Sequence, residues 1–258
     1  MSKISRRLVR APILSQIARL LVSLQNFMTR FFVTGEVSAR MDTENYVRLG
    51  TEYGGWWIAR SDLAQRDRGK VLISAGIGFD VSFDLKLAED DFELVCIDPL
   101  TESIDFAKTA LSSVKIVEFY NVGLADRSGK RTFYPPRNES HDSWSLIDIQ
   151  NGDCSNLQKF ETIGLSDLLI NIERFNKFVY LKMDIEGAEK EVLESLIEKN
   201  LKVDFLGVEM DYISLIPFFA ILTRIREVTY TRALLKRMSR RGYHFIGNDG
   251  FNFFWVRT

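Results

Sequence analysis

The sequence predicts an α/β fold with a mostly parallel, doubly wound sheet that ends in an antiparallel C-terminal hairpin. Short apolar runs alternate with helical patterns, a glycine-rich turn follows the first such run, and two apolar runs near the end are joined by a turn sequence. This alternation is typical of parallel sheets covered by helices on both faces. The predicted parallel strands are Val71–Ser74, Leu94–Ile97, Lys115–Val122, Val179–Met183 and Phe205–Met210.

Composition limits the class of protein. The chain has 258 residues, of which 46% are hydrophobic and 27% charged, as expected for one large globular domain. Its net charge of −1 gives no basis for nucleic-acid binding. Cys96 and Cys154 form no disulfide framework, which predicts a reducing, cytoplasmic location, and His141 and His244 are too few for a multi-histidine metal centre, so we expect no metal. No apolar run reaches the roughly 18 residues that span a bilayer.

Residues 1–40 form a distinct N-terminal arm ahead of a domain over residues 41–258. The arm contains seven basic residues against one acid, Glu36, and Leu14, Ile17 and Leu21 follow helical spacing along one face. An amphipathic basic helix of this kind either packs on the following domain or lies peripherally on a membrane or a partner protein. A second basic helical segment is predicted at about 213–241.

The glycine-rich turn indicates a nucleoside site. Gly76 and Gly78 follow the first predicted strand, and Asp98 ends the second strand 22 positions after Gly76, next to Pro99. This is close to the separation at which a first-strand glycine turn and a second-strand acid hold a nucleoside, with the acid on the ribose hydroxyls. Without Asp98, a simple strand-to-helix turn would be the better explanation of the glycines.

The residues after the turn favour S-adenosylmethionine over a dinucleotide. A dinucleotide site has a third small residue where this chain has Val81, and Asp80 would repel a diphosphate. The amino group and sulfonium of S-adenosylmethionine are positive and would be attracted to that carboxylate. An NAD-dependent oxidoreductase remains the less favoured alternative.

Two irregular segments are candidates for covering the site. Tyr53, in an aromatic and glycine-rich stretch before the first strand, either closes over a ligand or belongs to the core. The long polar segment from Pro135 to Asn156 is typical of a lid or substrate loop and contains His141, which is either a proton acceptor or simply solvated.

Acidic residues follow the fourth and fifth predicted strands. Asp184 and Glu186 come directly after the fourth strand, and Glu209 ends the fifth. Because parallel strands bring their carboxyl ends to the ligand crevice, we expect Asp184 there, although it is also a candidate helix N-cap. Glu189 is interpreted as stabilising the first turn of a helix, and Gly187 suggests a close approach to the backbone.

Three further local predictions can be tested by structure. Thr101 is expected to cap a helix that runs to about Ser112. The turn sequence Asp126–Gly129 predicts a small hairpin, and the terminal hairpin is predicted from Tyr243–Gly247 and Phe251–Val256.

Two of these segments together resemble the FkbM-type methyltransferases. Val71–Gly78 provides the glycine turn, and Lys182–Glu189 matches the family's Lys-[Ile/Met]-Asp-[Val/Ile]-Glu-Gly-Ala-Glu segment throughout. The resemblance covers roughly Tyr46 to Met210 and implies a Rossmann-like class I methyltransferase fold. It is silent on the N-terminal arm and on the basic segment near the C-terminus.

The resemblance implies how the cofactor S-adenosyl-L-methionine is held. The backbone at Gly76 and Gly78 would hold its methionine portion, Asp98 the ribose, and the Gly123–Asp126 segment the adenine. Ser74 stands where the family usually has an acid, so that it supplies a weaker polar contact and Asp80 is expected to compensate. The cofactor-binding prediction comprises Tyr53, Ser74, Gly76, Gly78, Asp80, Asp98, Pro99, Leu124 and Asp126.

The implied activity is O-methylation of a hydroxyl on a sugar or another small natural product. Asp184 is the leading candidate for the base, with Glu186, Glu209 and His141 in reserve. The alternative from another class is a non-catalytic adaptor that keeps the fold and contacts a membrane or a partner through its basic segments. The sequence does not select the acceptor or the oligomeric state.

Overall fold

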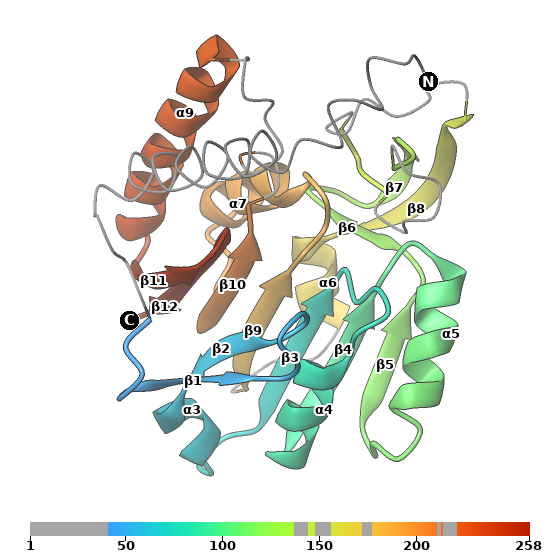
Figure 1. The fold of residues 1–258 in the computed structure, drawn as a ribbon, viewed down its shortest axis with the longest axis vertical. Helices are drawn as coiled ribbons and strands as arrows, with labels where there is room; N and C mark the ends of the chain where they lie inside the picture. The colour runs from blue at the N-terminus through green and yellow to red at the C-terminus, as the bar shows by residue number, and fades with distance from the viewer. Residues whose placement is uncertain (1–40, 137–143, 148–155, 172–176, 211–212, 214–220) are drawn as a thin grey trace, which may run out of the picture.

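A seven-stranded sheet forms the centre of the molecule, in the order β11–β12–β10–β9–β3–β4–β5 (Figure 1). This computed structural model describes residues 41–136, 144–147, 156–171, 177–210, 213 and 221–258. Five strands run parallel. They are β3 (Lys70–Ala75), β4 (Phe92–Ile97), β5 (Val117–Tyr120), β9 (Phe178–Met183) and β10 (Phe205–Glu209).

The C-terminal hairpin completes the sheet beside β10. Strand β12 (Asn252–Arg257) pairs antiparallel with both β10 and β11 (Tyr243–Asp249). The predicted terminal hairpin is therefore confirmed, and so is the mostly parallel α/β fold. The chain builds β3, β4 and β5 outward to one edge and then returns to β9 on the other side of β3. Ligands bind at such a point of reversal, outside the carboxyl ends of the strands.

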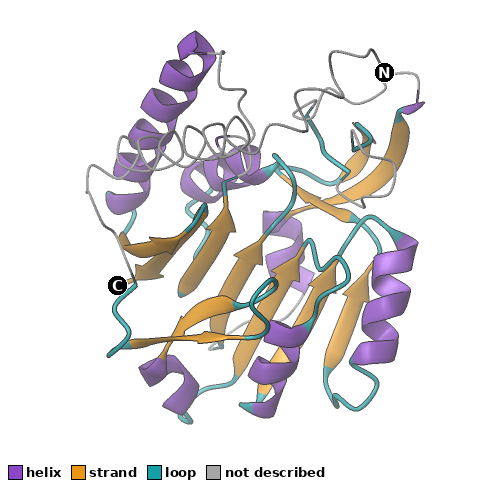
Figure 2. Cartoon of the chain, in the orientation of Figure 1, coloured by secondary structure: helices purple, strands orange, loops and turns teal. Residues whose placement is uncertain are grey.

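Helices cover both faces of the sheet (Figure 2). Successive side chains of β3 point to opposite faces of the sheet, so Val71 and Ile73 pack in one hydrophobic cluster and Leu72 packs in the other. The first cluster includes residues of α6 (Leu165–Asn171), α7 (Glu189–Glu198) and α9 (Ile221–Ser239). The second includes residues of α4 (Ser82–Glu89) and α5 (Thr101–Ala110).

A small β-hairpin, β1 (Tyr46–Leu49) and β2 (Trp56–Ala59), packs on the α4 face. The short helix α3 (Arg60–Ala64) follows and leads into β3. Trp56 and Ile58 of β2 are buried in the same cluster as α4, so the hairpin extends that layer. The β1–β2 connection consequently lies beside the start of α4.

The prediction of a local hairpin after β5 is wrong, because this part of the chain belongs to a separate three-stranded sheet. It consists of β6 (Gly123–Ala125), β7 (Gly129–Phe133) and β8 (Gln158–Gly164). Its order is β6–β8–β7, so β8 lies between the two strands that flank the turn, and these strands do not pair with each other. The chain does turn at Asp126–Gly129, but the pairing partner comes from further along the sequence.

Other local predictions have mixed outcomes. Thr101 is the first residue of α5 rather than its cap, and its hydroxyl donates to Asn121 Oδ1 over 2.9 Å. The predicted basic segment at 213–241 contains α9, whereas the N-terminal arm lies outside the described residues. Among the described residues, no helix combines the length and apolar character needed to cross a bilayer.

Candidate active site

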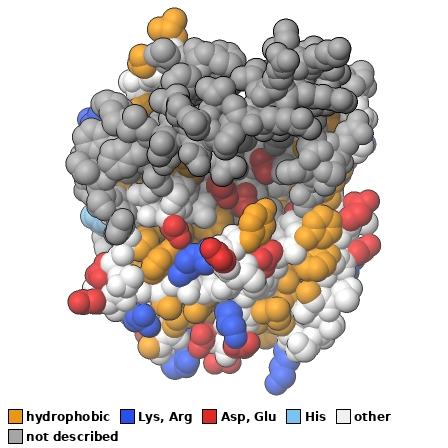
Figure 3. Space-filling view, in the orientation of Figure 1, with side chains coloured by type: hydrophobic (Ala, Val, Ile, Leu, Met, Phe, Trp, Pro, Cys, Tyr) orange, Lys and Arg blue, Asp and Glu red, His pale blue; other side chains and the backbone are white. Residues whose placement is uncertain are grey.

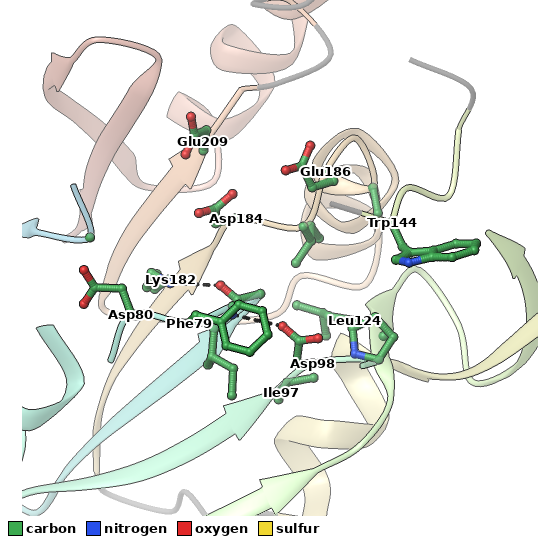
Figure 4. A pocket seen from close by; sticks show the side chains of 18 of the residues that line it. Phe79, Asp80, Ile97, Asp98, Leu124, Trp144, Lys182, Asp184, Glu186 and Glu209 are labelled. Atoms are coloured by element: carbon green, nitrogen blue, oxygen red, sulfur yellow. Dashed lines mark hydrogen bonds between the residues drawn. The ribbon is translucent and has the colours of Figure 1, made fainter. Parts of the chain in front are cut away.

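A cavity of about 290 Å³ opens at the carboxyl ends of β3, β4, β9 and β10 (Figure 4). The predicted residues that line it are Tyr53, Gly76, Gly78, Asp80, Asp98, Pro99, Leu124, Asp184, Glu186 and Glu209. Among the described lining residues, five are acidic and one, Lys182, is basic. The space-filling view shows acidic side chains gathered in a hollow near the centre of one face (Figure 3). The chain therefore brings negative charge to the ligand edge of its sheet.

The first glycine turn is shaped by close contact between chain segments. Gly76 has a φ of +72°, and a Cβ added to it would lie 1.6 Å from the carbonyl oxygen of Asp184. Its N–H donates to the carbonyl of Ile97, and Asp184 N–H donates to the carbonyl of Ala75. Gly78 also has a positive φ, of +51°. Gly76 thus lets β3 and β9 converge at the pocket, a requirement that exists before any ligand binds.

Asp98, which directly follows β4, holds the same turn in place by hydrogen bonds. One oxygen of its buried carboxylate accepts from Gly78 N–H at 3.1 Å and the other from Leu100 N–H at 2.9 Å. Asn121 donates to the carbonyls of Asp98 and Pro99, so the loop after β4 is also held in place. A carboxylate offers about four acceptor sites, and Asp98 also lines the cavity. The predicted ribose contact at Asp98 is compatible with this geometry.

Asp80 holds the β1–β2 connection against the start of α4. Its carboxylate accepts from the Thr51 hydroxyl at 2.6 Å and from Ser82 N–H at 2.8 Å, and Thr51 in turn accepts from Gly54 N–H. Burial raises the pKa of Asp80, but the hydrogen bonds from Ser82 and Thr51 outweigh it and hold the pKa below its usual value. Tyr53, carried by this connection, is 93% exposed at the cavity rim. Asp80 therefore lines the cavity and also anchors the segment that carries Tyr53.

Three carboxylates, those of Asp184, Glu186 and Glu209, lie at the β9–β10 side of the cavity (Figure 4). Burial, together with the charges of Asp184 and Glu186, raises the pKa of Glu209 to about 8, while Lys182 opposes the shift. This shift favours the protonated form of Glu209 at neutral pH.

The turn between β9 and α7 sets the positions of these acids. Glu186 has a φ of +53° and Gly187 of +102°, so the backbone turns sharply before α7 begins. The Ser145 hydroxyl donates to the Glu186 carbonyl, and Glu189 accepts from the N–H groups of Ile185 and Gly187. The fully buried Glu189 is thus structural, as predicted, and Gly187 is explained by turn conformation rather than by an approaching ligand.

Lys182 forms part of the cavity floor, and the sequence predicts no role for it. Its side chain is 3% exposed, its ammonium donates to the Gly76 carbonyl at 3.1 Å, and it lies 5.2 Å from the centre of the Trp56 ring. A charged residue inside the apolar strand Val179–Met183 is the signal that would have identified it. The positive charge of Lys182 offsets part of the negative charge of the acidic residues that line the cavity.

Two predicted residues, Ser74 and Asp126, are not brought to the cavity. Ser74 is fully buried on the α4 face of β3, and Asp126 instead pairs with Arg131 at 2.8 Å at the start of the small sheet. His141 lies outside the described residues. Conversely, Phe133, Trp144 and Asn252 line the cavity although sequence reasoning did not select them, because distant strand pairing brings them there. Within the described residues, no group of three or more His, Cys, Asp or Glu side chains is arranged to hold a metal ion.

A mostly parallel, doubly wound sheet with an acid-lined cavity at its point of chain reversal defines an α/β protein with a candidate ligand site at the usual edge of the sheet. The sequence matches the Methyltransferase FkbM domain family over residues 68–245. The chain therefore belongs to the FkbM methyltransferase family, and the resemblance found in Lys182–Glu189 is confirmed.

Solved structures and curated proteins were also compared. A crystal structure from Pseudomonas syringae, assigned as a methyltransferase, is 15% identical with a TM-score of 0.34, covering 77% of this chain and 97% of its own. A TehB-like SAM-dependent methyltransferase from Corynebacterium glutamicum is 10% identical with a TM-score of 0.34, covering 76% and 84% respectively. No curated protein matches the chain.

Proposed function

We propose that this methyltransferase uses S-adenosyl-L-methionine to methylate a hydroxyl of a sugar or another small natural product. The observation that carries the proposal is the acidic lining of the cavity, where Asp80, Asp98, Asp184 and Glu186, together with the largely protonated Glu209, surround the space at the carboxyl edge of the sheet. Such a lining suits a ligand with a positive sulfonium and amino group and disfavours a diphosphate.

The residues present fit this cofactor in a second respect. The backbone of Gly76 and Gly78 comes to the cavity without side chains, so a ligand can approach it closely. Asp98 follows the adjacent strand β4 and is an acid of the kind that binds ribose hydroxyls, and Leu124 provides an apolar wall for an adenine. These contacts are the ones expected for a nucleoside held across β3 and β4.

The chemistry divides between cofactor and protein. S-adenosylmethionine supplies an already activated methyl group on its sulfonium. The chain's part is to align the acceptor oxygen with that group, to exclude water and to remove the hydroxyl proton as the new bond forms. Asp184, at the carboxyl end of β9, is our leading base or acceptor-orienting residue, with Glu186 and Glu209 in reserve.

The acceptor side of the cavity supports the substrate class. Trp144 lines the same cavity as Asp184 and Glu186, and in Figure 4 its ring lies on the other side of Glu186 from Asp184. An apolar ring face next to carboxylate acceptors suits a polyhydroxylated molecule, which combines C–H surfaces with hydroxyl donors. Among natural products, sugars and sugar-bearing compounds have this character most consistently.

Calorimetric titration of the full chain with S-adenosylhomocysteine tests the cofactor. We expect micromolar, one-to-one binding that is weakened at least tenfold by Asp98→Ala, with Asp105→Ala on the exposed face of α5 as the matched control. Absence of binding to the unmodified chain would refute the proposal and favour the non-catalytic adaptor. Labelled S-adenosylmethionine incubated with fractionated extract then identifies the acceptor by its labelled product.

A further inference from the structure

The β1–β2 connection, residues 50–55, is closely packed at each of its glycines. Gly50 has a φ of +95°, and a Cβ added to it would lie 2.9 Å from the Cα of Gly55. A Cβ added to Gly54 would lie 2.4 Å from Asp80 Cγ, and one added to Gly55 would lie 2.4 Å from Arg48 Nη1. Glycine thus stands where a side chain would push Asp80 or Arg48 away. The connection is held closely on two sides although glycine backbone is intrinsically flexible.

Arg48 of β1 contacts both the connection and the C-terminal hairpin. Its Nη1 and Nη2 donate to the carbonyls of Thr51 and Glu52, each over 2.7 Å. Its Nε donates to Asp249 Oδ2 over 3.3 Å, and Trp57 Nε1 donates to the same oxygen over 3.1 Å. Because Arg48 and Trp57 are directly opposite in the β1–β2 register, their side chains share one face of the hairpin. One guanidinium therefore links two carbonyls of the connection to the end of β11.

Thr51 holds the other side of the connection against the start of α4. Its hydroxyl donates to Asp80 Oδ2 over 2.6 Å, and its N–H donates to Ser82 Oγ over 2.8 Å. The same hydroxyl accepts from Gly54 N–H over 2.9 Å. Hydrogen bonds to two separate parts of the fold, α4 on one side and the C-terminal hairpin on the other, thus fix the path of the connection.

Tyr53 lies within this closely held segment and yet points into solvent. Its side chain is 93% exposed, and it lines the cavity. It therefore buries little of its apolar surface against the described chain, so that packing within the protein does not explain its position. A ligand in the cavity would supply an apolar contact for the ring.

The anchors of the connection indicate which end of the cavity Tyr53 faces. Asp80 and Ser82 follow the glycine turn directly, whereas Asp98 follows β4. In the proposed function the glycine turn takes the methionine portion of the cofactor and Asp98 takes the ribose. The connection is joined to the methionine side of the cavity.

We propose that Arg48 is a positioning residue that braces the β1–β2 connection against the C-terminal hairpin, so that Tyr53 covers the methionine end of the bound cofactor. This inference rests on the proposed function, because it takes the cavity as the cofactor site. The Arg48 and Asp249 side chains are 27% and 49% exposed, and exposed ion pairs contribute little to the free energy of unfolding. The effect of Arg48 therefore lies in ordering the rim before the ligand binds, which reduces the conformational entropy lost on binding.

The test compares S-adenosylhomocysteine binding, measured by calorimetry, among variants of Arg48 and Tyr53. Arg68→Gln is the matched control, because Arg68 forms a similarly exposed ion pair with Asp204 over 3.0 Å, at the amino ends of β3 and β10. We expect Tyr53→Ala to weaken binding about tenfold and Tyr53→Phe to stay within about threefold, since the ring provides the contact. Arg48→Gln should weaken binding about fivefold, and Arg68→Gln should leave it unchanged.

The double variant Arg48→Gln/Tyr53→Ala separates positioning from any other role of Arg48. If Arg48 acts through Tyr53, its removal adds nothing once the ring is gone, and the double variant binds within about twofold of Tyr53→Ala. Losses that multiply in the double variant overturn the inference. So does a Tyr53→Ala variant that binds within twofold of the unmodified chain.

Hydrogen exchange of the backbone N–H groups in residues 50–55 tests the bracing without a ligand. We expect Arg48→Gln to speed exchange of the Gly54 N–H about tenfold or more and Arg68→Gln to leave it unchanged. Equal protection in the two variants overturns the inference even if binding differs. Failure of the unmodified chain to bind S-adenosylhomocysteine would refute the proposed function and the contact of Tyr53, whereas exchange would still decide whether Arg48 holds the connection.

Discussion

Replacing Gly76 by Ala tests the geometry on which the cavity depends. The new Cβ would lie 1.6 Å from the Asp184 carbonyl oxygen, less than half of an ordinary contact of about 3.5 Å. The ends of β3 and β9 must therefore separate, which breaks the 3.0 Å bond from Asp184 N–H to the Ala75 carbonyl. A left-handed alanine costs about 1–2 kcal/mol and the lost hydrogen bond about 0.5–1.5 kcal/mol, so we expect a loss of roughly 1.5–3.5 kcal/mol.

Gly250→Ala is the matched control for this substitution. Gly250, in the terminal hairpin turn, has a similar φ of +63°, but no atom of the described residues lies within 4 Å of a Cβ added there. It should therefore lose only the conformational contribution of about 1–2 kcal/mol and retain S-adenosylhomocysteine binding. Urea unfolding and calorimetry measure both effects. Equal stability losses and equal binding in the two variants would refute the assigned role of Gly76.

Three further predictions concern the site. Asp184→Asn should lower turnover about 10²–10⁴-fold while S-adenosylhomocysteine binding stays within threefold, and full activity would exclude it as the base. Because Glu209 has its pKa raised from 4.5 to about 8, the folded chain binds more protons than the unfolded one between these values. Its contribution to the unfolding free energy therefore falls by up to about 1.4 kcal/mol per pH unit as pH rises, and Glu209→Gln should flatten that slope in urea titrations from pH 5 to 8; an unchanged slope would count against it. Thr51→Val removes the 2.6 Å bond to Asp80 and should weaken S-adenosylhomocysteine binding about 3–10-fold, at a stability loss of about 1 kcal/mol; unaltered binding would show that the β1–β2 connection does not shape the site.

The parallel core was predictable because its strands are short, continuous apolar runs. Val71–Ser74 and Val179–Met183 fall within β3 and β9, since strands buried on both faces require apolar residues at successive positions. The hairpin β11–β12 was predictable for a different reason, its Asn248-Asp249-Gly250 turn sequence. In both cases the residues of the segment itself are sufficient to predict its secondary structure.

The small sheet was not predictable in the same way. Strand β6 has only three residues, and half of β8 is exposed and polar, so neither shows a clear apolar pattern. Their pairing joins Leu124 to Ile163, well separated in the chain. Which strands pair is decided by packing of the whole domain, and a turn sequence such as Asp126–Gly129 carries no information about it.

The candidate site likewise combines features that the sequence predicts with features that depend on tertiary packing. The sequence places Asp98 and Asp184 at strand ends, and the topology of a parallel sheet then brings them to one edge. It does not reveal that Asp80 is engaged by Thr51, because that contact depends on how the β1–β2 connection packs. Nor does it reveal that the acid Asp84 is buried, since this depends on how α4 lies on the sheet.

A crystal structure of the full chain with S-adenosylhomocysteine would test the central claim most directly. We predict density in the cavity between β3 and β4, with the ribose hydroxyls on Asp98, the amino-acid portion along Gly76 and Gly78, and the sulfur directed toward Asp184. An empty cavity at saturating ligand, or a ligand bound elsewhere with Asp98 uninvolved, would contradict the assignment of this site to methyl transfer.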